Sequence, residues 1–226
     1  MEEKNYEKYN HPGYVEQLKP ETKYTSRKVQ VDGITLYDSE ASFRRNFLKK
    51  HLKNTVAAFA AGLYWLTEYR GFMFVYAAVM AESLADSVAS KIGPLTDGRT
   101  VDICTFRPAQ AGISGAVSLA GTLAALMGSI CIGLLWLVSS RCGSAEAALV
   151  AVVGFLGCMS DSMLGSCVQV RYRCTCCGKV TERNEHCGAA CIKEKGIVWM
   201  NNDAVNLLSN VFALVLALAA YVVAAD

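Results

Sequence analysis

The sequence predicts an all-α membrane protein with about five transmembrane helices. Of its 226 residues, 53% are apolar and only 19% are charged, and the formal net charge is +2. This composition excludes a disordered chain and a strongly basic nucleic-acid binder, so no nucleic acid is expected as a partner. Residues 111–139 contain no charged side chain. Because about 20 residues cross the hydrocarbon core as a helix, this run is long enough to span a bilayer.

The distribution of charge divides the chain into two regions. Residues 1–53 hold half of the 22 Lys and Arg residues and are interpreted as a polar cytoplasmic arm. Residues 54–226 form the predicted transmembrane helical domain, which includes a Cys-rich cytoplasmic loop at 171–203. The five crossings are expected at 54–67, which is the shortest, and at 72–90, 111–139, 145–170 and 204–225.

Basic residues gather in alternate connections between these crossings. They are frequent before residue 54 and in the loops 91–110 and 171–203, whereas the turns 68–71 and 140–144 carry one each. Cytoplasmic loops of membrane proteins carry an excess of Lys and Arg. We therefore expect a multi-pass membrane protein whose N-terminus and two long loops lie in the cytoplasm.

Three carboxylates interrupt the apolar segments. Glu82 and Asp86 lie four residues apart, on one face of the second crossing, and Asp161 lies in the fourth. Ionisable residues inside membrane helices usually face the bundle interior or a wet cavity and mark functional sites, although a structural polar contact is the alternative. The expected topology places all three near the cytoplasmic boundary, where their oxygen atoms could hold Mg²⁺.

Small and polar residues are expected at the same membrane level. Asp-Ser occurs at 86–87 and again at 161–162, which suggests two parallel, related helices. Glycines at the start of the third crossing would let backbone N–H groups approach a phosphate, and helix packing explains them equally well. The candidate substrate- and nucleotide-binding residues are Glu82, Ser87, Lys91, Gly112, Ser114, Gly115, Thr122, Ser162, Gly165, Gln169, Arg171, Asn201 and Asn206.

Four motifs, in this order along the chain, resemble a known family. They are ADSVASKIG at 85–93, GISGAVSLAGT at 112–122, GFLGCMSDSMLG at 154–165 followed by Gln169, and WMNNDAVN at 199–206. From about residue 54 onward the chain resembles the multi-pass integral membrane family containing plant phytyl-phosphate kinase and animal transmembrane protein 19. Lys91 stands where that family usually has Glu. The family usually has further apolar helices upstream of residue 54, so this chain could be a shortened member, a fragment, or half of a split assembly in which another chain supplies those helices.

The resemblance implies an isoprenoid-phosphate kinase. Such an enzyme transfers a phosphoryl group from a nucleoside triphosphate, with CTP favoured over ATP, to a prenyl or phytyl monophosphate at the cytoplasmic face. Asp86 and Asp161, with Glu82 in support, would hold Mg²⁺. The expected catalytic residues are Asp86, Asp161, Asn202 and Arg107. The alternative, from a different functional class, is a non-enzymatic multi-pass membrane protein that binds or carries lipid phosphates.

The loop 171–203 contains five of the ten cysteines. The expected topology places this loop in the reducing cytoplasm, where disulfides are rare. Cys174 and Cys177 have the C-x2-C spacing, and His186 and Cys187 follow nine residues later. These four ligands could form a tetrahedral Zn²⁺ site that folds the loop, with Cys191 as the alternative to His186 and free thiols as the alternative to metal.

Overall fold

The computed structural model describes most of the predicted helical domain and little of the arm. The described residues are 30–31, 34–35, 55–95, 98–141 and 143–225. The chain divides into two units, 1–50 and 51–226. In the first unit, β1 (Gln30–Val31) and β2 (Ile34–Thr35) pair antiparallel. The remainder of the predicted arm lies outside the described residues.

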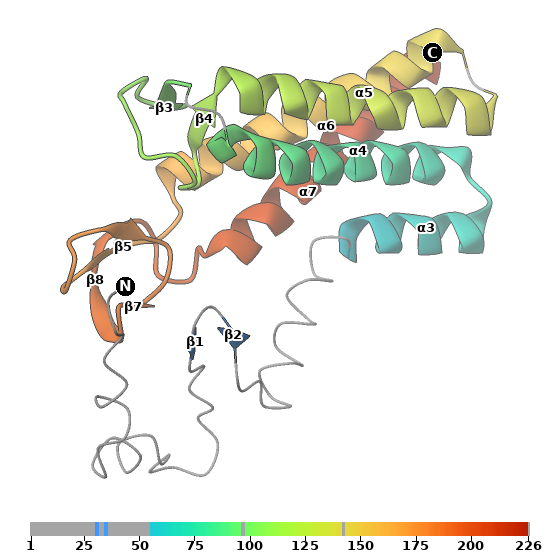
Figure 1. Ribbon diagram of the computed structural model, residues 1–226. Helices are drawn as coiled ribbons and strands as arrows, with labels where there is room; N and C mark the ends of the chain where they lie inside the picture. The colour runs from blue at the N-terminus through green and yellow to red at the C-terminus, as the bar shows by residue number, and fades with distance from the viewer. Residues whose placement is uncertain (1–29, 32–33, 36–54, 96–97, 142, 226) are drawn as a thin grey trace. The chain divides into compact units, whose positions relative to one another are not determined.

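The second unit confirms the predicted all-α membrane fold (Figure 1). Its α-helices, within the described ranges, are α3 (Thr55–Thr67), α4 (Arg70–Ile92), α5 (Leu119–Ser140), α6 (Ser144–Cys167) and α7 (Asn202–Ala225). The helices α4 to α7 are each long and apolar enough to cross a membrane. The 13 residues of α3 rise about 20 Å, which is less than the hydrocarbon thickness of about 30 Å.

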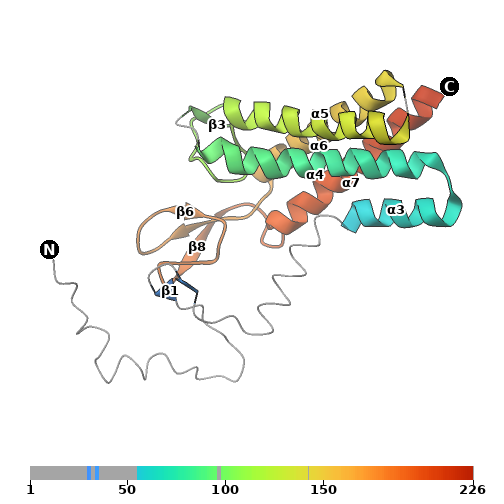
Figure 2. The ribbon, with the colours of Figure 1, turned by 45° about the vertical axis from the view of Figure 1, so that its right-hand side comes forward.

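Helix α4 is the centre of the bundle and packs against α3, α5, α6 and α7. The helices α4 and α6 run in the same direction, and α5 and α7 begin at the end of the bundle where α4 and α6 finish (Figures 1 and 2). Glycines on α6 allow the close approach. A Cβ atom at Gly157 would lie 2.6 Å from Cγ of Glu82, and a Cβ atom at Gly154 would overlap Ala81.

The third crossing begins later than the sequence predicts. Residues 111–118 are not helical, and β4 (Ala116–Ser118) pairs antiparallel with β3 (Thr100–Asp102). Gly112 and Gly115 have φ angles of 82° and 80°, in the left-handed region that a right-handed helix cannot contain. The hydroxyl of Ser118 then caps α5 by accepting a hydrogen bond from the backbone N–H of Gly121 at 3.2 Å.

The Cys-rich loop forms a small sheet between α6 and α7. Its strands are β5 (Arg171–Cys174), β6 (Val180–Thr181), β7 (Glu185–His186) and β8 (Ala189–Lys195). They lie in the order β6-β5-β8-β7, and Cys174 on β5 is opposite Cys191 on β8. The fourth crossing therefore ends at Cys167, three residues before its predicted end.

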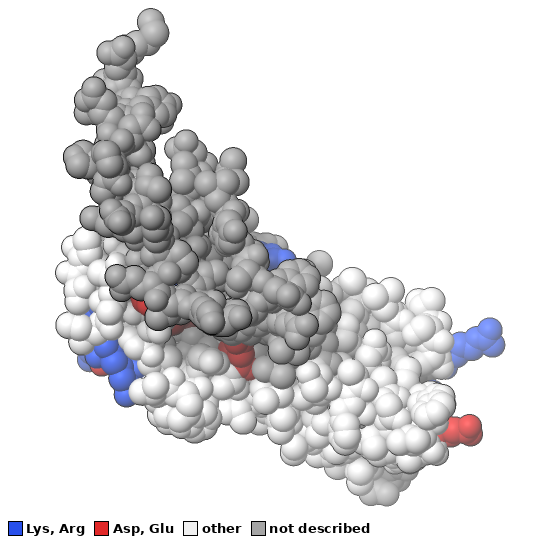
Figure 3. All heavy atoms as spheres, turned by 90° about the horizontal axis from the view of Figure 1, so that it is seen from below, with Lys and Arg blue, Asp and Glu red and all other residues white. Residues whose placement is uncertain are grey.

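The outer surface of the helices is apolar. Leu134, Leu135 and Val138 on α5 and Val215 and Val222 on α7 are all more than half exposed. Charged side chains are sparse on the helical body in the face shown in Figure 3. An apolar belt of this extent is typical of a surface that a lipid bilayer covers, since its exposure to water is unfavourable.

Candidate functional site

A pocket of about 250 Å³ lies at the end of the bundle where α4 and α6 finish and α5 and α7 begin. Its wall combines the last turns of α4 and α6, the loop 111–118, the first turn of α5 and the start of α7. Eight residues predicted from the sequence line it together: Asp86, Gly112, Ser114, Gly115, Thr122, Asp161, Ser162 and Asn202. Segments that are separate in the sequence therefore meet at one cavity.

Two of the three carboxylates that line the pocket come from parallel, neighbouring helices, and the third belongs to Glu182. Asp86 lies on α4 and is half-buried, and Asp161 lies on α6 with 8% of its surface exposed. The hydroxyl of Ser209 on α7 donates a hydrogen bond to Oδ2 of Asp161 at 3.2 Å. Carboxylate oxygens supplied by two rigid helices, beside the amide of Asn202, give the all-oxygen set of ligands that Mg²⁺ prefers.

Glu82 lies behind the pocket wall. It is 1% exposed and is not among the residues that line the cavity. Its carboxylate accepts hydrogen bonds from the hydroxyl of Ser209 at 2.8 Å and from the side-chain amide of Asn210 at 2.9 Å. Ser209 also hydrogen-bonds to Asp161, so Glu82 is linked to the pocket indirectly, through Ser209.

Sequence reasoning missed Ser209 and Asn210. Both are buried in the apolar helix α7, three and four residues after Asn206. That spacing places all three on one helix face, so a polar stripe in an otherwise apolar helix was the available signal. Asn206 was predicted as a ligand-binding residue, but it is 3% exposed, and its amide donates to the backbone carbonyl of Asn202 at 2.7 Å.

Three residues hold the loop that contains Gly112 and Gly115, all by hydrogen bonds to Ser114. The backbone N–H of Ser114 donates to Oε1 of Glu182 at 2.8 Å, and the Ser114 hydroxyl accepts from the Gln169 amide at 3.0 Å. The backbone carbonyl of Ser114 accepts from Nη2 of Arg171 at 2.6 Å. Gln169 and Arg171 thus support the loop and do not line the cavity.

Asp102 joins β3 to the end of α6. It accepts hydrogen bonds from the backbone N–H groups of Cys104 and Thr105 at 3.1 and 3.0 Å, and from the hydroxyl of Ser166 at 2.7 Å. Burial acts to raise the pKa of Asp102, but these hydrogen bonds outweigh burial and lower the pKa below its usual value. Its carboxylate also lies 3.8 Å from the Arg171 guanidinium, so it orients the residue that supports Ser114.

The other predicted site residues lie outside the cavity. Asn201 caps α7, since its side-chain oxygen accepts from the backbone N–H of Ala204 at 3.0 Å. Gly165 packs against the loop, and a Cβ atom there would lie 2.9 Å from Cβ of Ser114. The remaining three, which do not line the pocket either, are Ser87, Lys91 and Arg107. Lys91 and Arg107 are exposed.

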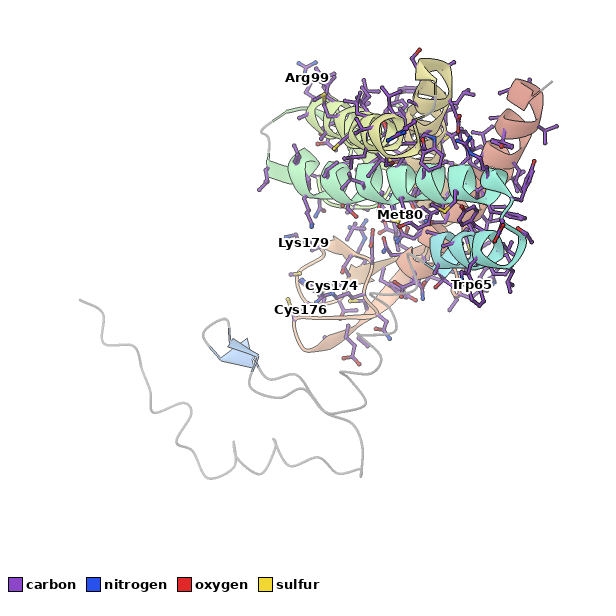
Figure 4. The ribbon with its side chains drawn as sticks, turned by 90° about the vertical axis from the view of Figure 1, so that its right-hand side faces the viewer. Trp65, Met80, Arg99, Cys174, Cys176 and Lys179 are labelled. Carbon is purple, nitrogen blue, oxygen red and sulfur yellow. The ribbon has the colours of Figure 1, made fainter. Side chains whose placement is uncertain are left out.

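The predicted zinc ligands lie together on the small sheet. One donor atom from each of Cys174, Cys177, His186 and Cys187 lies within 4.8 Å of the others, and we call these residues the Cys/His cluster. Figure 4 labels Cys174 on this sheet, together with Cys176, which is not part of the cluster. A hydrogen bond from the backbone N–H of Cys177, with further help from His186, lowers the pKa of the Cys174 thiol to about 6.

The comparison with protein families identifies the chain. The family described as "Integral membrane protein DUF92" matches residues 22–214. The chain belongs to this family. The matched region begins within the predicted arm, upstream of residue 54, and it includes all the residues that line the pocket.

Three relatives extend this result. Protein PGR of Arabidopsis thaliana is 32% identical over 135 residues, which cover 55% of this chain and 46% of that protein. Protein VTE6, chloroplastic, of Arabidopsis thaliana is 24% identical over 138 residues, covering 61% and 34%. Uncharacterized membrane protein MJ0933 of Methanocaldococcus jannaschii is 23% identical over 175 residues, covering 77% and 62%. The chain thus spans about half or less of the two plant proteins, and no solved structure matches it significantly.

Proposed function

We propose that this protein is an integral membrane isoprenoid-phosphate kinase, which transfers the terminal phosphoryl group of a nucleoside triphosphate to a prenyl or phytyl monophosphate. One observation carries the proposal. Each of the four motifs that carry the family resemblance contributes to the wall of one cavity, through Asp86, the loop 112–115, Asp161 and Asn202. Membership of the DUF92 family supports the part of the proposal that concerns an integral membrane protein.

The position of the pocket suits a substrate with an apolar tail and a phosphate head. The cavity lies at the ends of helices whose outer surfaces are apolar. An isoprenoid chain would lie along these helices, since burial of its apolar surface is favourable there, and its phosphate would lie at the polar boundary. A nucleotide would enter at the same polar end from the aqueous side.

The reaction needs positioning and charge neutralisation more than proton transfer. An oxygen of the monophosphate attacks the γ-phosphorus, and the bond from that phosphorus to the bridging oxygen breaks. The nucleoside diphosphate leaves with the electron pair, and no proton is transferred overall. Because the second pKa of a phosphate monoester is about 6, the nucleophile is already ionised near neutral pH. This agrees with the absence of histidine from the residues that line the described pocket.

The residues of the pocket have separate tasks in this mechanism. Asp86 and Asp161 would hold Mg²⁺, which when bound neutralises charge on the nucleotide phosphates. Asn202 would orient a phosphate oxygen by donating from its amide. Gly112 lines the cavity, and nothing lies within 4 Å of the position that its Cβ atom would take, so its backbone could approach a phosphoryl group closely.

Turnover by the purified full chain in lipid nanodiscs tests the proposal. The assay supplies Mg²⁺, γ-labelled CTP, ATP or GTP, and geranyl, farnesyl, geranylgeranyl or phytyl monophosphate. We expect a labelled diphosphate, and we expect Asp86→Asn and Asp161→Asn to lower turnover by about 10²-fold or more. Glu68→Gln is the matched control, because Glu68 is exposed in the turn before α4, at the opposite end from the pocket. Binding of a monophosphate without turnover with any nucleotide would favour the lipid-phosphate carrier.

A further inference from the structure

We propose that residues 171–195 form a zinc module, in which Cys174, Cys177, His186 and Cys187 bind one Zn²⁺, and that this module holds the glycine loop of the pocket in place through Glu182. The metal site is independent of the kinase proposal. The second part concerns the same pocket, and its tests need no substrate.

The spacing of the donor atoms fits tetrahedral coordination. Zn–S bonds of about 2.3 Å and Zn–N bonds of about 2.0 Å at tetrahedral angles separate two sulfur ligands by about 3.8 Å, and a sulfur from a nitrogen by about 3.5 Å. Sγ of Cys177 lies 3.8 Å from Sγ of Cys187 and 3.5 Å from Nδ1 of His186. These two separations match the values that a zinc ion would impose, Sγ of Cys187 lies 3.2 Å from Nδ1 of His186, and all four donor atoms lie within 4.8 Å of one another.

The backbone presents these ligands in two pairs. Cys174 and Cys177 lie at the turn between β5 and β6, and His186 and Cys187 lie at the turn between β7 and β8. Gly178 and Gly188 follow the second ligand of each pair with φ angles of 69° and 70°. Two hairpins that each supply two ligands from a tight, glycine-containing turn resemble structural zinc ribbons, although His186 and Cys187 are adjacent and lack the usual spacing.

The sheet lacks an apolar core that could fold it without a metal. Between residues 171 and 199, all of which the structure describes, Cys174 is the one buried residue. Ile192 and Val198 are both more than 60% exposed, and β6 and β7 are two residues long. A small unit of this kind usually needs a metal or disulfides for stability, because its buried apolar surface is too small.

Glu182 connects the module to the pocket. It lies between β6 and β7, it accepts the backbone N–H of Ser114 at 2.8 Å, and it lines the cavity. Arg171 on β5 donates to the backbone carbonyl of Ser114 at 2.6 Å. Both contacts come from one sheet. A folded sheet therefore holds the loop 112–115 in its conformation.

The metal content of the purified full chain tests the first part. We expect one zinc per chain by mass spectrometry, and Cys177→Ser and His186→Ala should lose most of it. Cys176→Ser and Cys191→Ser are the matched controls, since both thiols lie in the same segment but outside the Cys/His cluster, and both variants should keep the metal. Replacement by Co²⁺ should give the visible absorption of tetrahedral thiolate coordination. Wild-type protein without zinc after growth in zinc-supplemented medium, or equal loss in the Cys176 and Cys191 variants, would overturn the site.

Hydrogen exchange tests the link to the pocket. Removal of zinc by a strong chelator should accelerate exchange at the backbone N–H of Ser114 by tenfold or more. Glu182→Gln should accelerate the same amide while the protein keeps its zinc. An unchanged Ser114 amide after zinc removal would refute the coupling but leave the metal site intact. Since neither measurement uses a nucleotide or an isoprenoid, failure of the kinase assay leaves both results interpretable.

Discussion

Two buried carboxylates from different helices share one hydroxyl group. The Ser209 oxygen lies 2.8 Å from Glu82 and 3.2 Å from Asp161, although a hydroxyl has a single hydrogen to donate. Glu82 also accepts from the Asn210 amide, whereas Asp161 faces the pocket. Ser209 thus links the carboxylate that lines the pocket to the one buried behind it.

Ser209→Ala is expected to lower the thermal stability of the purified protein. The substitution removes the donor between Glu82 and Asp161, and the loss of one intramolecular hydrogen bond costs about 0.5–1.5 kcal/mol. Ser129→Ala is the control, because Ser129 is equally buried and its hydroxyl donates to the carbonyl of Leu126 within α5. The measurement is the Tm of both variants in the same detergent, and equal losses in Tm would contradict the role assigned to Ser209.

Gly115→Ala is expected to damage the pocket more than Gly112→Ala. Both glycines have φ near 80°, so a Cβ atom strains the backbone at either position by about 1–2 kcal/mol. A Cβ atom at Gly115 would also lie 2.5 Å from Cα of Ser166, whereas nothing lies within 4 Å of the corresponding position at Gly112. Thermal unfolding and binding of labelled nucleotide to both variants measure the difference. An equal loss of stability in the two variants would contradict the prediction that the close contact with Ser166 adds to the destabilisation by Gly115→Ala.

The sequence indicated some site residues and missed others for physical reasons. Asp86 and Asp161 could be recognised because a carboxylate in an apolar membrane segment is energetically costly and is therefore rare outside functional sites. Arg107 and Lys91 were selected by charge alone, and both are exposed and outside the cavity, since a long basic side chain is readily solvated in a loop. Glu182 was missed because its role depends on a contact with Ser114, 68 residues away.

Among the elements, the connection between β3 and β4 is tied to the end of α6. Asp102 and Ser166 form one link, and the thiols of Cys104 and Cys167 form another, with their Sγ atoms 3.0 Å apart. Both cysteines are exposed. The loop that lines the pocket therefore begins and ends against the same helix, because Gly115 also packs on Ser166.

Mild oxidation with diamide is expected to join Cys104 to Cys167. Diamide takes two electrons and two protons from the thiol pair, and a separation of 3.0 Å needs little movement to reach the disulfide distance of about 2.05 Å. Mass spectrometry of the digested protein should find the cross-linked peptide. Cys131 serves as the internal control, since it is exposed on α5 and no thiol partner is found for it within the described residues. A disulfide that involves Cys131 in place of this pair would contradict the packing of the loop on α6.

The helix boundaries show where hydropathy stops being informative. The second crossing was predicted at 72–90 and is found as α4 (Arg70–Ile92), because apolar content and length define it. The third was predicted from residue 111 but starts at Leu119, since hydropathy does not report the left-handed φ of Gly112 and Gly115. The strands of the zinc module were not predicted either, because their order depends on the pairing of segments far apart in the loop.

At the scale of the whole molecule, the pocket and the zinc module lie at the same end of the bundle. The four long helices α4 to α7 alternate in direction, so the connection 93–118 and the connection 168–201 must emerge on one side of the membrane. The connection 168–201 carries six Lys and Arg residues and the connection 93–118 carries two, whereas the turns 68–71 and 140–144 at the opposite end carry one each. The positive-inside rule then predicts that the pocket opens to the cytoplasm, where nucleotides are abundant.

Labelling with a membrane-impermeant maleimide tests this orientation. In intact cells, a cysteine introduced at the exposed turn by Glu68→Cys should react, because that turn lies at the end of α4 opposite the pocket. The native, exposed Cys176 should react only after the membrane is opened, because it lies in the zinc module beyond the end of α6. Since the two thiols lie at opposite ends of the same spans, one experiment reports the accessibility of both sides of the membrane. Permeabilised cells give the value for full labelling of each thiol. Reaction of Cys176 in intact cells with protection of residue 68 would invert the orientation and place the pocket where cytoplasmic nucleotides cannot reach it.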